Sequence, residues 1–136
     1  MIITKKYEEQ KTAETAHRVD ARGMYETEDA AISIIALQPG ESLKRHITPV
    51  DVAFFVLDGK GTVEIGDEKQ EVGKYTLVES PKDILHCWYN TGDELLRFMG
   101  ITAPQPTKKT IFVGAGRRGC SGSERAASLG NGALAV

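Results

Sequence analysis

Two histidines, His46 and His86, are the side chains of this 136-residue sequence best suited to chemistry. A neutral imidazole binds divalent transition metals, and it also exchanges hydrogen bonds near neutral pH. Alternate side chains of an extended strand share one face, so Thr48 should lie beside His46, and Trp88 and Asn90 beside His86. The sequence therefore predicts two strands that each present a histidine together with polar or aromatic neighbours.

Further candidates surround these histidines in the sequence. Asp51 and Glu79 are carboxylates that could supply another metal ligand, although a solvated surface position is the commoner role for an acid. Phe54 and Trp88 would either line a pocket or pack in the core, and for Phe54 we favour the core. Arg97 stands in an apolar segment, where it needs an acid partner or an anionic ligand.

The elements that must position these residues are short, apolar and rich in β-branched side chains. They occupy residues 32–37, 52–57, 62–65, 69–72, 75–78, 86–89 and 95–102. Gly, Pro, Asn and Asp separate them, and no clear amphipathic helix pattern precedes residue 120. This spacing predicts an all-β single domain, an antiparallel jelly roll or barrel.

The segment 52–57 is apolar at both alternating positions. A strand of this kind must be covered on both faces. One cover is the interior of the domain, and the other would be a second layer or a second copy of the chain. We therefore expect a homodimer.

Two stretches of the sequence resemble the two motifs of the cupin family. In the first, Gly40, His46 and Gly59 keep the family spacing, and in the second His86 and Asn90 do so. The resemblance implies a cupin β-barrel in which His46 and His86 meet in the interior and bind a divalent metal, Zn, Ni, Fe or Mn.

The metal motif is incomplete in this chain. Thr48 stands where the family has a second histidine, and Val52 where it has a glutamate. A strong site normally has three or four protein ligands, so any metal should be weakly held. His17, in the segment Ala-His-Arg-Val-Asp, could cap the barrel mouth, but a surface histidine is the default.

These observations lead to a functional expectation. We expect a small cupin barrel that binds a small polar molecule at its mouth, with Thr48, Phe54, Trp88 and Arg97 lining the pocket. The alternative is a metal-dependent cupin enzyme of the isomerase or oxygenase type acting on a small molecule. A mainly structural dimeric barrel would need nothing from the pocket.

Composition narrows the partners and the location. Charged residues make up 26% of the chain and the net charge is −2, which does not suggest nucleic-acid binding. The N-terminus has no signal-peptide pattern and no segment is apolar enough to span a membrane, so we expect a cytoplasmic protein. Cys87 and Cys120 have no metal or redox spacing, and we expect no disulfide.

The chain should divide into a barrel and a tail. We assign residues 1–112 to the barrel, with Ile2 and Ile3 as a candidate edge strand at its N-terminus. Residues 113–136 are rich in Gly, Ala and Ser and have few apolar side chains. Such a composition predicts a flexible tail.

Overall fold

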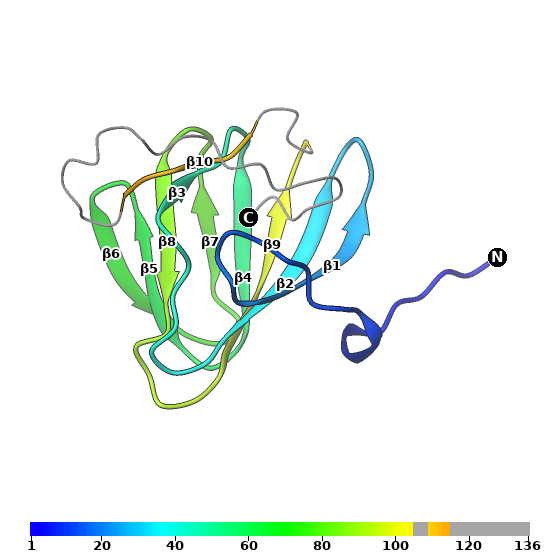
Figure 1. Cartoon of the computed structure of the whole chain (residues 1–136), viewed down its shortest axis with the longest axis horizontal. Coiled ribbons are helices and arrows are strands. Elements are labelled where there is room, and N and C mark those ends of the chain that lie inside the picture. Colours follow the sequence, from blue (N-terminus) through cyan, green and yellow to red (C-terminus); the bar gives the residue numbers. More distant parts are fainter. Residues whose placement is uncertain (105–108, 115–136) are drawn as a thin grey trace.

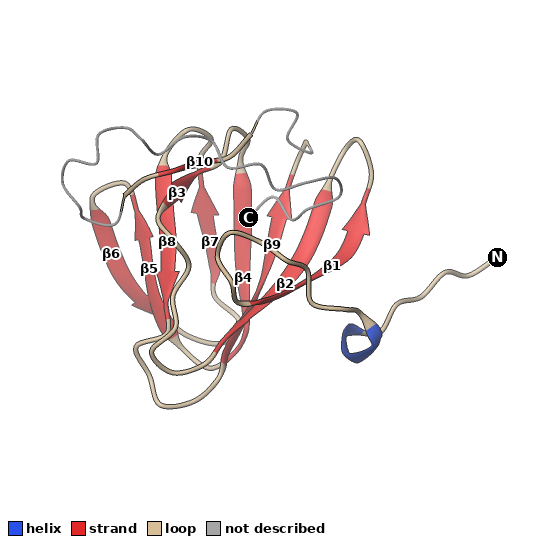
Figure 2. Cartoon of the chain, in the orientation of Figure 1, coloured by secondary structure: helices blue, strands red, loops and turns tan. Residues whose placement is uncertain are grey.

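The structure is a computed structural model that describes residues 1–104 and 109–114. The expected tail, residues 113–136, lies outside the described residues except for its first two. The described chain contains a short 3-10 helix, Tyr7–Glu9, and ten strands (Figures 1 and 2). The strands are β1 Asp20–Glu26, β2 Ala31–Leu37, β3 His46–Ile47, β4 Val52–Asp58, β5 Gly61–Ile65, β6 Glu68–Val72, β7 Leu77–Ser80, β8 Leu85–Tyr89, β9 Leu96–Thr102 and β10 Ile111–Phe112.

The strands form two five-stranded antiparallel sheets. The first sheet has the order β1-β2-β9-β4-β7, and the second has the order β10-β3-β8-β5-β6. Figure 1 shows them as the facing walls of one barrel, with β3 and β10 across the end at the top of the view. This arrangement confirms the all-β jelly-roll fold predicted from the sequence.

Alternating side chains of both sheets fill the space between them. On β4, Val52, Phe54 and Val56 point inward and are buried, as the alternation of a strand requires. The Trp88 ring stacks on the Phe98 ring with centroids 4.3 Å apart, and Phe54 meets Trp88 edge-on at 5.4 Å. An aromatic cluster that joins the two sheets therefore forms the centre of the core.

The turn between β4 and β5 depends on a glycine. Gly59 has a φ of +77°, a conformation that L side chains rarely adopt. A Cβ at this position would lie 2.2 Å from the carbonyl oxygen of Leu95. The family spacing that includes Gly59 thus reflects a close approach of two backbones.

The outer face of the first sheet is also apolar. Ala53, Phe55 and Leu57 of β4 point outward and are half-buried. Phe55 is the cross-strand partner of Met99 on one side and of Leu77 on the other. Leu77 is 54% exposed, so this apolar row reaches solvent within the single chain.

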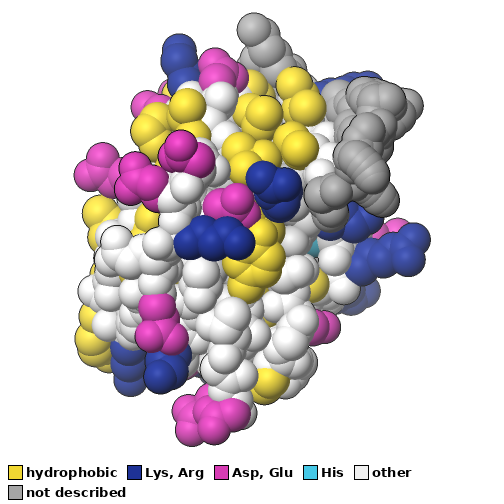
Figure 3. Space-filling model, turned by 90° about the vertical axis from the view of Figure 1, so that its left-hand side faces the viewer, with side chains coloured by type: hydrophobic (Ala, Val, Ile, Leu, Met, Phe, Trp, Pro, Cys, Tyr) yellow, Lys and Arg dark blue, Asp and Glu magenta, His cyan; other side chains and the backbone are white. Residues whose placement is uncertain are grey.

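The edge of the barrel at β6 carries an apolar groove. Figure 3 looks onto this side, where hydrophobic side chains gather in the upper part with acidic and basic side chains around them. A groove of about 200 Å³ lies there, lined by residues of β5, β6 and β7 that include Val63, Val72 and Val78. Because these valines also border the core, the groove reaches the space between the sheets.

The N-terminal part differs from the sequence-based expectation. Ile2 and Ile3 lie outside any strand and are 90% and 78% exposed, so the edge strand expected there is wrong. The N-terminal strand is β1, which pairs with β2 and has an irregular register between Gly23 and Tyr25. Within the described residues, no helix combines the length and the apolar character needed to cross a bilayer.

Candidate functional site

The structure brings the two predicted histidines together inside the barrel. His46 of β3 and His86 of β8 are direct cross-strand partners, and both are almost fully buried. Their Nε2 atoms lie 2.9 Å apart, within hydrogen-bond distance. The two side chains are therefore hydrogen-bonded to each other across the neighbouring strands β3 and β8.

The neighbours of the pair determine which nitrogen donates. The Nδ1 of His46 lies 2.7 Å from the carbonyl oxygen of Lys44, which can only accept, so His46 carries its proton on Nδ1. Its Nε2 then accepts, and the Nε2–H of His86 must be the donor. The Nδ1 of His86 in turn accepts from the hydroxyl of Ser80 at 2.7 Å. The bonds run in one direction, from Ser80 through both rings to Lys44.

Burial keeps this pair neutral. It lowers the pKa of His46 to about 4, although the hydrogen bond to the Lys44 carbonyl acts in the opposite direction. The pKa of His86 is also lowered, mainly by burial and further by the charges that His46 and His17 would carry. Both rings are therefore uncharged at neutral pH.

A third histidine completes the group. His17, in the loop before β1, is 7% exposed, and its ring centroid lies 4.6 Å from that of His46. Its Nδ1 accepts from the backbone N–H of Lys44 at 2.9 Å, and Phe112 of β10 packs against it at 5.3 Å. The surface position expected for His17 is wrong, and the ring caps the pair. The sequence around His17 is polar, and His17 is buried because it packs against segments far along the chain, at Lys44 and Phe112.

Other predicted site residues lie around the pair. The hydroxyl of Thr48 is 3.2 Å from the Nε2 of His86, and Thr48 is buried. Phe54 and Trp88 are fully buried in the aromatic cluster, and the Phe54 ring meets the His86 ring edge-on at 5.3 Å. Ser80, which the sequence analysis did not single out, is the partner of Val52 across β7 and β4. A serine that follows the exposed Glu79 at the end of a strand gave no signal of this role.

Arg97 does not join this group. It alternates with Leu96 and Phe98, whose side chains point inward, and it therefore lies on the outer face of the first sheet. There its guanidinium forms an ion pair with Asp58 and stacks over the Tyr7 ring at 4.9 Å. The acid partner required by the sequence is present, and the placement of Arg97 in the pocket lining is corrected.

The residues around the pair do not fit a resident divalent metal. Asp51 is exposed and accepts from the backbone N–H of Lys82 at 2.9 Å, and Glu79 is exposed on the outer face of β7. Val52 points inward but has no donor atom. Within residues 1–104 and 109–114, no group of three His, Cys, Asp or Glu side chains could hold a metal ion. Of the two Nε2 atoms, only that of His46 carries a lone pair, and this lone pair already accepts the hydrogen bond from His86.

Cys87 is a core cysteine, as its alternation with His86 suggests. Its thiol is fully buried and lies 3.1 Å from the carbonyl oxygen of Leu43, to which it donates. Burial raises the pKa of Cys87 to about 11, so little thiolate forms at neutral pH. Cys120, the other cysteine, lies outside the described residues.

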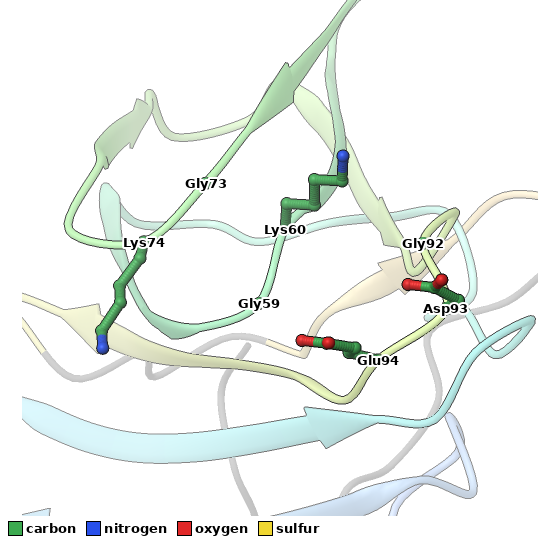
Figure 4. Close-up of a pocket in the computed structure, with 7 residues that line it drawn as sticks. All are labelled: Gly59, Lys60, Gly73, Lys74, Gly92, Asp93 and Glu94. Carbon is green, nitrogen blue, oxygen red and sulfur yellow. The ribbon is translucent and has the colours of Figure 1, made fainter.

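A charged pocket lies at the opposite end of the barrel from the histidines (Figure 4). Its volume is about 470 Å³, and it is formed by the turns that follow β4, β6 and β8. Its lining consists of three glycines, Gly59, Gly73 and Gly92, with Lys60, Lys74, Asp93 and Glu94. Both signs of charge are present there, in contrast to the neutral histidine end.

Comparison with known proteins agrees with this fold. No curated protein matches the sequence. Among solved structures, an uncharacterised protein with a double-stranded β-helix domain from Klebsiella pneumoniae has a TM-score of 0.71 at 15% identity, covering 85% of this chain and 100% of its own. The polyketide cyclase RemF from Streptomyces resistomycificus has a TM-score of 0.67 at 14% identity, covering 79% of this chain and 83% of its own.

A third structure is described as a predicted oxalate decarboxylase from Thermotoga maritima. It has a TM-score of 0.67 at 18% identity and covers 77% of this chain and 100% of its own. At these identities the structures are evidence of the fold alone. The sequence family described as the cupin domain matches residues 33–102 of the 136, and the chain therefore belongs to the cupin family.

Proposed function

We propose that this cupin binds a small polar molecule inside the histidine end of its barrel, with no resident metal. The observation that supports this proposal is the 2.9 Å contact between the Nε2 atoms of His46 and His86. The two rings satisfy each other and are fixed by Lys44 and Ser80. Histidines held in this way act as hydrogen-bonding groups rather than as an open metal site.

A divalent ion could enter only by displacing the proton between the two rings. Two imidazoles without a carboxylate provide too few ligands to compensate for that loss. Any Zn, Ni, Fe or Mn should therefore bind weakly. The enzyme alternative, an isomerase or oxygenase that uses a metal, would require a further acidic or imidazole ligand. Among the described residues Asp51 and Glu79 face away, and His17, whose Nδ1 accepts from the N–H of Lys44, forms no group with the pair that could hold a metal ion.

The proposed partners and location come from the sequence. A small molecule is the proposed ligand, and a cytoplasmic homodimer is the proposed state of the protein. Similarity to the cyclase and to the predicted oxalate decarboxylase supplies examples of proteins on this fold, and we take no reaction from either.

Elemental analysis before and after chelation tests the metal part of the proposal, on the wild type and on His86→Ala. We expect less than one equivalent of metal, removed by chelator, and an unchanged circular dichroism spectrum because the barrel does not depend on the ion. A full equivalent that resists chelation in the wild type and is absent from His86→Ala would overturn the proposal and favour the enzyme.

Binding itself can be followed through Trp88, the single tryptophan of the chain. Titration of a broad panel of small molecules into chelated protein should change its fluorescence for some members. A panel without any binder, by fluorescence and by ligand-observed NMR, would contradict the proposed binding role.

A further inference from the structure

The side chains that face the interior carry almost no charge. The polar groups at the histidine end of the two inner faces are neutral, namely Ser33, His46, Thr48, Ser80, His86 and Thr102. Within the described strands, the charged side chains at inward-facing positions are Glu26 of β1 and Glu68 of β6, and both are exposed on strands at the edges of their sheets. A charged ligand buried here would lack a counter-charge, which is costly in a low-dielectric interior.

One strip of the first sheet has unusually small inward side chains. Gly23 of β1 is the cross-strand partner of Ser33 of β2, and Ser33 is the partner of Gly100 of β9. Three neighbouring strands therefore present nothing larger than a hydroxymethyl group along this row, which runs from the exposed Gly23 at the sheet edge to the buried Ser33 and Gly100. On β9 the strip lies next to Phe98, the stacking partner of Trp88.

Two buried polar atoms near this strip have no hydrogen-bond partner within the described residues. They are the indole Nε1 of Trp88 and the hydroxyl oxygen of Thr102. Thr102 is two residues beyond Gly100 on the same face of β9. Leaving a buried donor unpaired costs about 1–3 kcal/mol, so such atoms point to a missing acceptor.

We propose that the interior selects an uncharged small molecule that offers a carbonyl or amide oxygen to the Trp88 N–H and lies over the strip of Gly23, Ser33 and Gly100. The Thr102 hydroxyl, two residues beyond Gly100 on the same face, offers the bound molecule a second hydrogen bond. This inference rests on the proposed binding function and adds the class of ligand to it. A carboxylate or a cation is excluded because the buried part of the inner faces offers it no counter-charge, since Glu26 and Glu68 are exposed at the sheet edges.

Matched probes that differ only in charge test the selection. Benzamide, benzoate and benzamidinium have nearly the same shape, and equivalent triplets on smaller and larger skeletons extend the series. Each is titrated at neutral pH into the full chain labelled with ¹⁵N. We expect the neutral member to bind at least about tenfold more tightly than either charged member, because burying a charge without a counter-charge costs more than burying a neutral amide.

The indole N–H of Trp88 gives one cross-peak in the ¹⁵N spectrum, because the chain has a single tryptophan. A neutral probe that accepts its hydrogen bond should shift this peak. A charged probe that binds only in the pocket of Lys60, Lys74, Asp93 and Glu94 should leave it in place. The readout therefore separates interior binding from binding at the other end.

Thr102→Val removes the hydroxyl with little change of shape. It should weaken the neutral probe about tenfold. The control Thr91→Val removes an exposed hydroxyl, whose bond to Thr62 lies outside the barrel interior, and should leave binding unchanged. Circular dichroism of each variant verifies that it folds.

The outcomes separate this inference from the function on which it rests. If charged members shift the indole peak as strongly as neutral ones, the ligand class is wrong while binding stands. If neutral members bind without shifting that peak and Thr102→Val has no effect, the assigned contacts are wrong. If no member of any triplet binds, both this inference and the proposed function are refuted.

Discussion

Acid should destabilise the fold through the buried histidine pair. The pKa of His46 is lowered to about 4 by burial, whereas an unfolded histidine titrates near about 6.5. The unfolded chain therefore takes up the proton first as the pH falls. The contribution of His46 to stability is complete above about pH 6.5, declines as the pH falls toward 4, and changes little below that.

The magnitude follows from the number of protons taken up on unfolding. One proton corresponds to about 1.4 kcal/mol per pH unit. Near pH 5.5 an unfolded His46 is about nine-tenths protonated and the folded one almost entirely neutral, which gives a slope of about 1.2 kcal/mol per pH unit. The whole interval amounts to about 3 kcal/mol for His46, and His86, whose pKa is lowered too, adds in the same direction.

Urea unfolding at half-unit steps between about pH 7 and about pH 5 measures this slope, in a range where ordinary carboxyl groups bind few protons. His46→Gln is the matched control, because its amide can donate to Lys44 and accept from His86 without titrating. It should lose about 1 kcal/mol per pH unit of slope. A wild-type stability that stays level over this range, or an equal slope in the variant, would refute the reasoning.

Three other perturbations test separate parts of the structure. Ser80→Ala removes the 2.7 Å hydrogen bond to the pair and should cost about 1–3 kcal/mol in urea unfolding, against less than about 0.5 for the exposed control Thr91→Ala; equal losses would contradict the role of Ser80. The homodimer that we propose through the outer face of the first sheet should be weakened by Phe55→Lys, and light scattering that gives a monomer for the wild type at micromolar concentration would exclude it. Gly59→Ala brings a Cβ to 2.2 Å from the Leu95 backbone and should lower the melting temperature by several degrees, whereas an unchanged melting curve would mean that the turn adapts freely.

Much of the fold could be predicted because most strands bury only one face. Residues 62–65 alternate clearly, and the structure has β5 at Gly61–Ile65. β1 was missed because its sequence mixes Arg, Gly and Glu with few apolar residues, and the irregular register between Gly23 and Tyr25 breaks the alternation. β10 has two residues, too few for any periodic signal.

The site was predictable in part, for reasons that differ between residues. The contact between His46 and His86 could be predicted from the family motifs, because these motifs place the two histidines on strands that meet inside the barrel. The outward position of Arg97 could have been deduced from the inward parity of Leu96 and Phe98. The burial of His17 could not, because it depends on a backbone contact with Lys44, 27 residues away. Tertiary packing of this kind leaves no local pattern.

The place of β9 within the first sheet has a consequence for how the chain is made. β9, Leu96–Thr102, lies between β2 and β4, so these two apolar strands have no common partner until residue 102 has left the ribosome. Until then the newly made chain exposes unpaired strand edges, which promote association between chains. Fusions that stall synthesis just before β9 should therefore aggregate more than those released after it, a difference that centrifugation of the nascent products would reveal.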